Sequence, residues 1–82
     1  MLSGKQTRPI THTSFKDLVN AQAVRRVEIL NDGKWWVLIH IGNVERTLHT
    51  KRGAVRQFSS LNTVENYLRS VGVQRFEVEL IT

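Results

Sequence analysis

The sequence contains no cysteine, a single proline and no apolar run long enough to cross a membrane. The lack of cysteine excludes a disulfide framework and thiolate zinc sites, and it fits a reducing compartment. The longest apolar run, Trp35 to Ile41, is interrupted by His40, whereas a membrane helix needs about 20 apolar residues. Residues 1–14 lack the apolar core of a signal peptide. We therefore expect a soluble, cytoplasmic protein without a membrane partner.

Sequence motifs of catalysis and metal binding are also missing. No phosphate-binding glycine loop and no nucleophile elbow occurs. The histidines His12, His40 and His49 have neither cysteine partners nor the spacing of metal ligands, so we interpret them as ordinary side chains. Glu77 and Glu79 share one face of an expected strand without a suitable partner, which indicates solvated carboxylates. We expect no enzyme, no metal site and no cofactor.

The chain has 82 residues, which is enough for one domain. Its 40% apolar content and its periodic patterns predict a folded core. A domain of this size buries only about 60% of its unfolded surface and is marginally stable alone. Oligomerisation is a common remedy, and we expect a homodimer.

Hydrophobic periodicity and turn residues place the elements of this domain. Residues 1–12 are polar and aperiodic, which predicts a flexible basic tail before a single domain over residues 13–82. Asn31-Asp32-Gly33 is a strong hairpin signal, and Gly72 follows a helical pattern where a terminating glycine belongs. The expected elements are a helix over 15–23, strands over 24–30, 35–41 and 44–50, a short strand over 55–58, a helix over 61–71 and a strand over 74–82.

This order, α-β-β-β-(β)-α-β, predicts an α+β fold with a mostly antiparallel sheet packed on helices. In the second strand, alternation places Trp35, Val37 and Ile39 on the core face. Trp36 and His40 then lie on the opposite, mixed face of the sheet.

Positive charge is concentrated in one stretch of the chain. Twelve basic residues stand against seven acidic ones, for a net charge of +5. No acidic residue occurs between Arg46 and Val64, a region that includes the segment TKRGAVRQF at 50–58. Such an uneven distribution favours a polyanionic partner, and nucleic acid is the one we expect.

Lysine and arginine neutralise phosphates, and a glycine allows close approach of a backbone whose N–H can donate to a phosphate oxygen. Trp36 is a candidate for stacking on a base, although a lone exposed tryptophan is more often a packing residue, and this face could also be half of a dimer interface. The basic turn could also be a plain solvated turn or bind an acidic protein. The residues predicted to contact nucleic acid are Lys5, Arg8, Trp36, Arg46, Lys51, Arg52, Gly53 and Arg56.

Residues 14–80 resemble the ParC-like family, the partition-associated proteins of plasmids and mobile elements, which are unrelated to the topoisomerase subunit of the same name. The resemblance implies an accessory role in plasmid maintenance or its regulation in a bacterial cytoplasm. It supplies no binding residues, so the predicted site rests on charge and strand position. The features that carry it are Ala23-Val24-Arg25, the aromatic strand ending at Gly42, Arg46, Arg52, Val55-Arg56, Phe58, Tyr67-Leu68-Arg69, Gly72 and Arg75-Phe76-Glu77-Val78.

We therefore expect a small DNA-associated accessory protein that binds nucleic acid through a basic turn. The alternative is a protein–protein adaptor that docks on a partition ATPase or a repressor without touching DNA. Phosphate binding weakens steeply with salt, whereas docking through an apolar face does not, so salt dependence discriminates the two.

Overall fold

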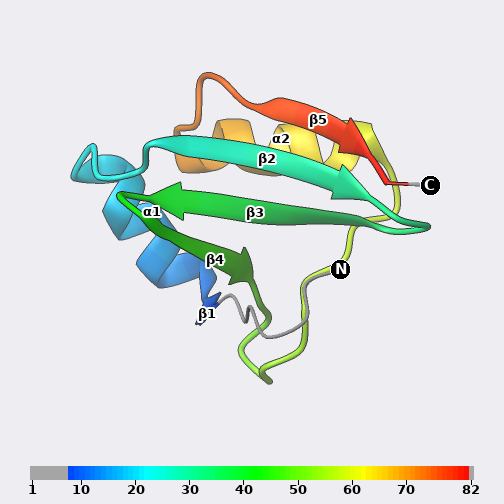
Figure 1. The fold of residues 1–82 in the computed structure, drawn as a ribbon, viewed down its shortest axis with the longest axis horizontal. Coiled ribbons are helices and arrows are strands. Elements are labelled where there is room, and N and C mark those ends of the chain that lie inside the picture. Colours follow the sequence, from blue (N-terminus) through cyan, green and yellow to red (C-terminus); the bar gives the residue numbers. More distant parts are fainter. Residues whose placement is uncertain (1–7, 82) are drawn as a thin grey trace.

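The computed structural model describes residues 8–81, which form a five-stranded sheet with both helices on one face (Figure 1). This confirms the predicted α+β class. Neither helix in that range is long and apolar enough to span a membrane. The elements are β1 (Arg8–Ile10), α1 (His12–Asn20), β2 (Arg26–Asn31), β3 (Trp35–Ile41), β4 (Val44–Leu48), α2 (Leu61–Val71) and β5 (Glu77–Leu80).

The sheet is mixed, and the expectation of a mostly antiparallel sheet is wrong. The strand order is β1-β4-β3-β2-β5. The meander β2-β3-β4 pairs antiparallel, while β1 pairs parallel with β4 and β5 pairs parallel with β2. Both parallel edge strands are connected to the meander through a helix, and a helical crossover brings the chain back in the same direction. Four of the five strands therefore run the same way, with β3 opposed to them.

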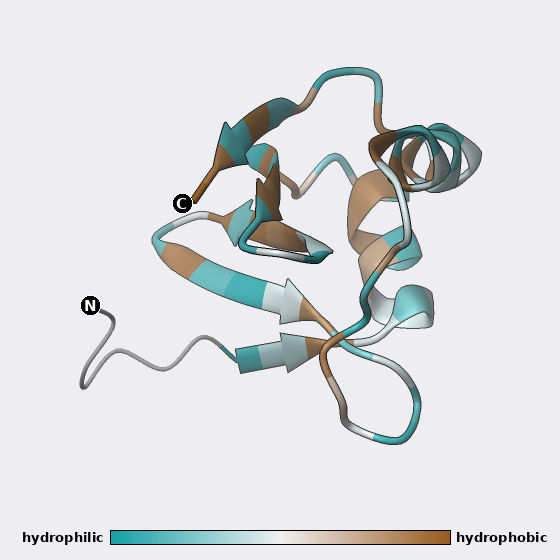
Figure 2. Cartoon of the chain, turned by 90° about the vertical axis from the view of Figure 1, so that its right-hand side faces the viewer, coloured by the Kyte–Doolittle hydropathy of each residue, from teal (hydrophilic) through white to brown (hydrophobic). Residues whose placement is uncertain are grey.

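The predicted meander and its two faces are confirmed. Val37 and Ile39 are fully buried on the face that the helices cover, and β3 has the predicted bounds. The Asn31 side chain accepts a hydrogen bond from the Gly33 N–H at 3.0 Å, which closes the hairpin between β2 and β3. The hydropathy view in Figure 2 shows the sheet and the helices as two layers with apolar segments between them.

The start of the described chain differs from the expected flexible tail. Arg8–Ile10 form an edge strand, and α1 begins at His12, so the tail interpretation is wrong for residues 8–12. Thr11 is the N-cap residue of α1 and makes no side-chain capping bond. The pairing of β1 with β4 fixes the chain immediately before α1. This long-range contact, and not a capping side chain, determines where the helix begins.

Helix α2 has the predicted bounds, and Ser60 is its N-cap residue. The Oγ of Ser60 accepts the Thr63 N–H at 3.1 Å. Val64 and Leu68 are fully buried on the side of α2 that faces the core. The helix ends at Gly72, which has a φ of +109° and whose N–H donates to the carbonyl of Leu68 at 3.1 Å.

We expect Gly72→Ala to lower the free energy of unfolding by about 1 to 2 kcal/mol, because an L side chain is strained at positive φ. An added Cβ would lie 3.4 Å from Val19 Cγ1, an ordinary contact, so the backbone is the source of the loss. Urea unfolding measures the effect. Asn66→Ala, on the exposed face of the same helix, is the control and should be neutral or slightly stabilising. If the urea midpoint of Gly72→Ala equalled that of the wild type, the expected backbone strain would be absent.

Candidate nucleic-acid interface

The predicted basic turn is an ordered hairpin, which we call the basic hairpin, residues 49–56. It projects beyond the sheet below β4 in Figure 1. The Thr50 N–H donates to the Ala54 carbonyl at 2.8 Å, and the Arg56 N–H donates to the Leu48 carbonyl at 2.9 Å. The fourth strand expected over 55–58 does not form. It is reduced to two isolated bridges, His49 with Val55 and Trp35 with Phe58.

The base of the basic hairpin lies against the start of α1. The His49 N–H donates to the Ile10 carbonyl at 2.8 Å, and Ile10 directly precedes the N-cap residue Thr11. A hollow of about 500 Å³ opens between the two segments, and we call it the basic pocket. No acidic residue is among those that line it, which are Thr11, His12, Thr13, His49, Thr50, Lys51 and Arg56.

Two aromatic rings hold the guanidinium of Arg56. Its Cζ lies 5.0 Å from the ring centroid of Phe58 and 4.6 Å from that of Tyr67. Phe58 is buried, and its N–H donates to the Trp35 carbonyl at 2.8 Å. The hairpin stem is thus fixed to the rigid domain, so Arg56 loses less conformational entropy on binding a ligand than a free side chain would.

Tyr67 connects the second helix to the start of the first. Its hydroxyl is 2.9 Å from Nδ1 of His12. Burial raises the pKa of Tyr67, with the charge of Arg56 partly opposing the shift, so the hydroxyl keeps its proton at neutral pH. Tyr67 therefore holds His12 beside the basic pocket as a neutral hydrogen-bonding partner.

The start of α1 contributes backbone donors and a favourable dipole to the basic pocket. The first N–H groups of an α-helix have no acceptor within the helix, and its N-terminus carries about half a positive charge. The first turn of α1 has no acidic side chain to offset this charge, and Thr11 does not cap it. An anion in the basic pocket would therefore meet two cationic side chains and a helix N-terminus.

The other predicted site residues that the structure describes lie at three further places. Arg52 and Gly53 are exposed at the hairpin tip, and the Gly53 N–H donates to the Thr50 carbonyl at 3.0 Å, so the turn itself engages this donor. Arg8 and Arg46 are directly opposite each other on β1 and β4. Like charges in such positions destabilise a sheet, and a phosphate between them would relieve the repulsion. The remaining residue, Lys5, lies outside the described residues.

Trp36 is separate from the basic pocket. It lies on the helix-free face of the sheet, where it lines a shallow hollow with Val55 and Gln57. On the same face His40 is buried and donates from Nε2 to Oε1 of Glu28 at 2.6 Å. The described residues contain no group of three or more side chains that could hold a metal ion.

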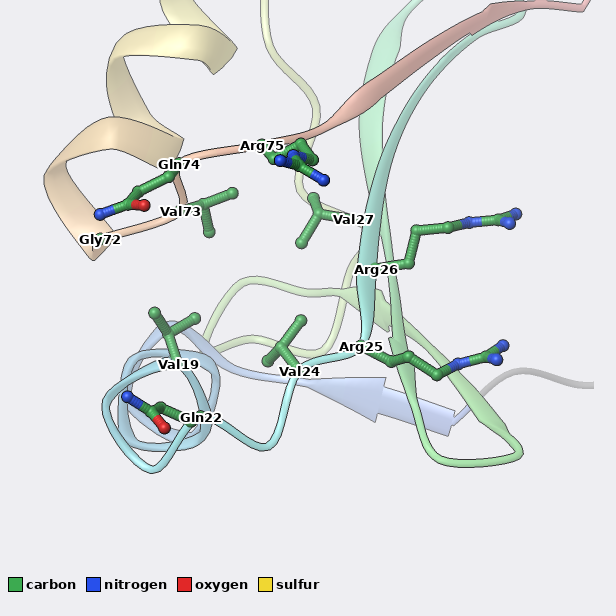
Figure 3. Close-up of a pocket in the computed structure, with 10 residues that line it drawn as sticks. All are labelled: Val19, Gln22, Val24, Arg25, Arg26, Val27, Gly72, Val73, Gln74 and Arg75. Carbon is green, nitrogen blue, oxygen red and sulfur yellow. The ribbon is translucent and has the colours of Figure 1, made fainter.

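A second hollow, of about 380 Å³, lies between the turns that follow α1 and α2 (Figure 3). Its lining includes three arginines, of which Arg25 and Arg26 extend to the right of the view, while Arg75 is seen nearly end-on. Arg26 pairs with Glu28 at 3.3 Å and with Glu77 at 3.5 Å. Within residues 8–81, none of the cations Arg25, Arg75, Lys51 and Arg56 forms an ion pair. Each hollow therefore has two unpaired cations in its lining, and the hollow of Figure 3 can serve as a control for the basic pocket.

The fold and the basic pocket define a small α+β domain with a cationic surface at one corner. Comparison with family models gives one finding: residues 10–82 match the family described as ParC-like. The chain belongs to the ParC-like family. No curated protein and no solved structure matches it.

Proposed function

We propose that this ParC-like protein is a plasmid-encoded, cytoplasmic accessory protein that binds DNA through the basic hairpin and acts in plasmid partition, maintenance or their regulation. The observation that carries the proposal is the convergence of Lys51 and Arg56 with the start of α1 around a pocket without acidic residues. Cations of this kind neutralise phosphates and release counterions. Arg52 is exposed on the hairpin, and Arg8 and Arg46 pair at the β1 edge of the sheet, so all three add positive charge to the protein.

The cations and the helix N-terminus of this arrangement suit phosphate oxygens, so we propose that it binds the nucleic-acid backbone without sequence readout. Trp36 does not line the basic pocket; it lies beside Val55 and Gln57 on the helix-free face of the sheet, and its contact with nucleic acid stays a prediction. We propose a homodimer as the binding form, because two basic pockets on one particle would add affinity through multivalency.

We expect the double variant Lys51→Ala/Arg56→Ala to bind DNA at least about tenfold more weakly than the wild type, with the salt slope reduced by about 2, because each lost phosphate contact lowers the slope by about 1. Fluorescence anisotropy with labelled duplex and single-stranded DNA, at low and near-physiological salt, measures both quantities. Circular dichroism checks that the variant is folded.

The matched control is Arg25→Ala/Arg75→Ala, which removes the same charge from the hollow of Figure 3. It should keep most of the wild-type affinity. Equal losses in the two variants would mean that net charge, and not the basic hairpin, drives binding. No binding by the wild type at low salt would overturn the proposal and favour the adaptor alternative.

A further inference from the structure

We propose that the basic pocket binds the phosphate monoester at the end of a nucleic acid strand in preference to an internal phosphodiester. This inference deepens the proposed function and rests on it. The positive charge of the basic hairpin alone favours any phosphate, whereas this inference names the terminal phosphate as the group that enters the basic pocket.

The shape of the basic pocket is the first argument. Its volume of about 500 Å³ lies within the range of about 300 to 1,000 Å³ typical of small-ligand sites. Three lining residues come from the start of α1 and four from the basic hairpin, so the walls face each other across the hollow. A duplex presents its internal phosphates on a convex surface, which lies along a flat or grooved partner. A strand end projects and can enter a hollow.

The charge of the pocket is the second argument. A phosphate monoester carries about −1.5 to −2 charges at pH 7, whereas an internal diester carries one. Lys51 and Arg56 supply two positive charges, and the N-terminus of α1 adds about half a charge. No acidic side chain among the lining residues offsets this positive charge. The positive charge of the pocket therefore matches the charge of a monoester dianion and is larger than the single negative charge of a diester.

The number and arrangement of donors is the third argument. A terminal phosphate has three unbridged oxygens, one more than a diester. The guanidinium of Arg56, held on the rings of Phe58 and Tyr67, presents a planar fork that binds two of them at once. The open N–H groups of the first turn of α1 can serve the third oxygen.

His49 supplies an observation that does not depend on charge or on the helix. Among residues 8–81 its buried Nδ1 atom has no hydrogen-bond partner, and His49 is one of the residues that line the basic pocket. Buried polar atoms in folded proteins nearly always have a partner, and Nδ1 would gain one from a phosphate oxygen if the His49 ring turned toward the hollow on binding.

The test compares three single-stranded oligonucleotides of one sequence in titrations of the full chain: 5′-phosphorylated, 3′-phosphorylated and unphosphorylated. Each carries its fluorescent label at an internal position. We expect at least one phosphorylated oligonucleotide to bind about tenfold more tightly than the unphosphorylated one. A nucleoside monophosphate should compete with it, and the corresponding nucleoside should not.

Two variants assign the preference to the basic pocket. Arg56→Lys keeps the charge and removes the planar fork, and Lys51→Ala removes an exposed charge that the core does not need. Each should reduce the preference for the phosphorylated end severalfold, while Arg25→Ala/Arg75→Ala should preserve it. A preference that survives unchanged in both pocket variants would overturn the assignment.

The remaining outcomes separate the two proposals. Equal binding of all three oligonucleotides would overturn the terminal-phosphate inference and leave DNA binding by the basic hairpin standing. If none of the three bound at low salt, the inference and the proposed function would both fail.

Discussion

Replacement of Phe15 by alanine is expected to lower the free energy of unfolding by about 3 to 5 kcal/mol. Phe15 is the one residue of α1 that is fully buried, and its ring lies 6.4 Å from that of Tyr67. Truncation removes most of the apolar area that α1 buries and leaves a cavity between the helix and the sheet. Small domains are stable by only about 5 to 15 kcal/mol, so this variant should be close to unfolding.

Urea unfolding followed by circular dichroism measures the loss. Leu18→Ala, at a half-buried position of the same helix, should cost clearly less, because less apolar area is lost. Phe15→Leu keeps most of the side-chain volume and should retain the fold. A loss below about 1 kcal/mol for Phe15→Ala would show that α1 is not held by this contact.

The second large effect is expected at Glu28, on the helix-free face of the sheet. Its side chain is almost fully buried, accepts a hydrogen bond from His40 at 2.6 Å and pairs with Arg26 at 3.3 Å. Burial raises the pKa of Glu28, but the bonds from His40 and Arg26 together outweigh it and hold the pKa below its usual value. We expect Glu28→Gln to lower the free energy of unfolding by about 2 kcal/mol at pH 7, because a charge-assisted hydrogen bond is lost.

The lowered pKa also fixes the direction of the pH effect. A carboxyl group with a lower pKa in the native state stabilises that state above its unfolded pKa of about 4.3, and the contribution is lost as pH falls through the native value. The free energy of unfolding of the wild type should therefore decrease as the pH falls from about 4.3 through the native pKa of Glu28. The decrease should be smaller in Glu28→Gln. Glu79→Gln, at an exposed position of β5, is the control and should follow the wild type. If the free energy of unfolding changed with pH equally in the wild type and in Glu28→Gln, the link between the Glu28 pKa and stability would be contradicted.

The elements predicted correctly are those whose signals are local in the chain. The Asn31-Asp32-Gly33 turn and the alternation of β3 determine the meander, and the spacing of Val64 and Leu68 determines α2. β1 could not be predicted, because three residues that include a proline carry no periodic signal. The parallel direction of the edge strands depends on helical crossovers, which a list of elements does not specify.

The residues of the candidate site also differ in whether a local signal in the sequence reveals them. Lys51 and Arg56 could be predicted because charge is visible residue by residue. His12 and Tyr67 could not, because their hydrogen bond joins residues 55 positions apart and each looks ordinary in its own segment. The buried Nδ1 of His49 likewise depends on β1, whose Ile10 carbonyl positions the base of the basic hairpin.

The parallel edge strands have a consequence for the order of folding. The meander joins chain neighbours, so its loops close early, whereas the pairing of β1 with β4 closes over a long stretch and is expected late. The basic pocket needs that late step, because it forms only when α1 starts beside the hairpin. A folding intermediate would carry the positive charges of the hairpin without the pocket. A ligand of the basic pocket would therefore recognise only the completely folded chain and shift the folding equilibrium toward it.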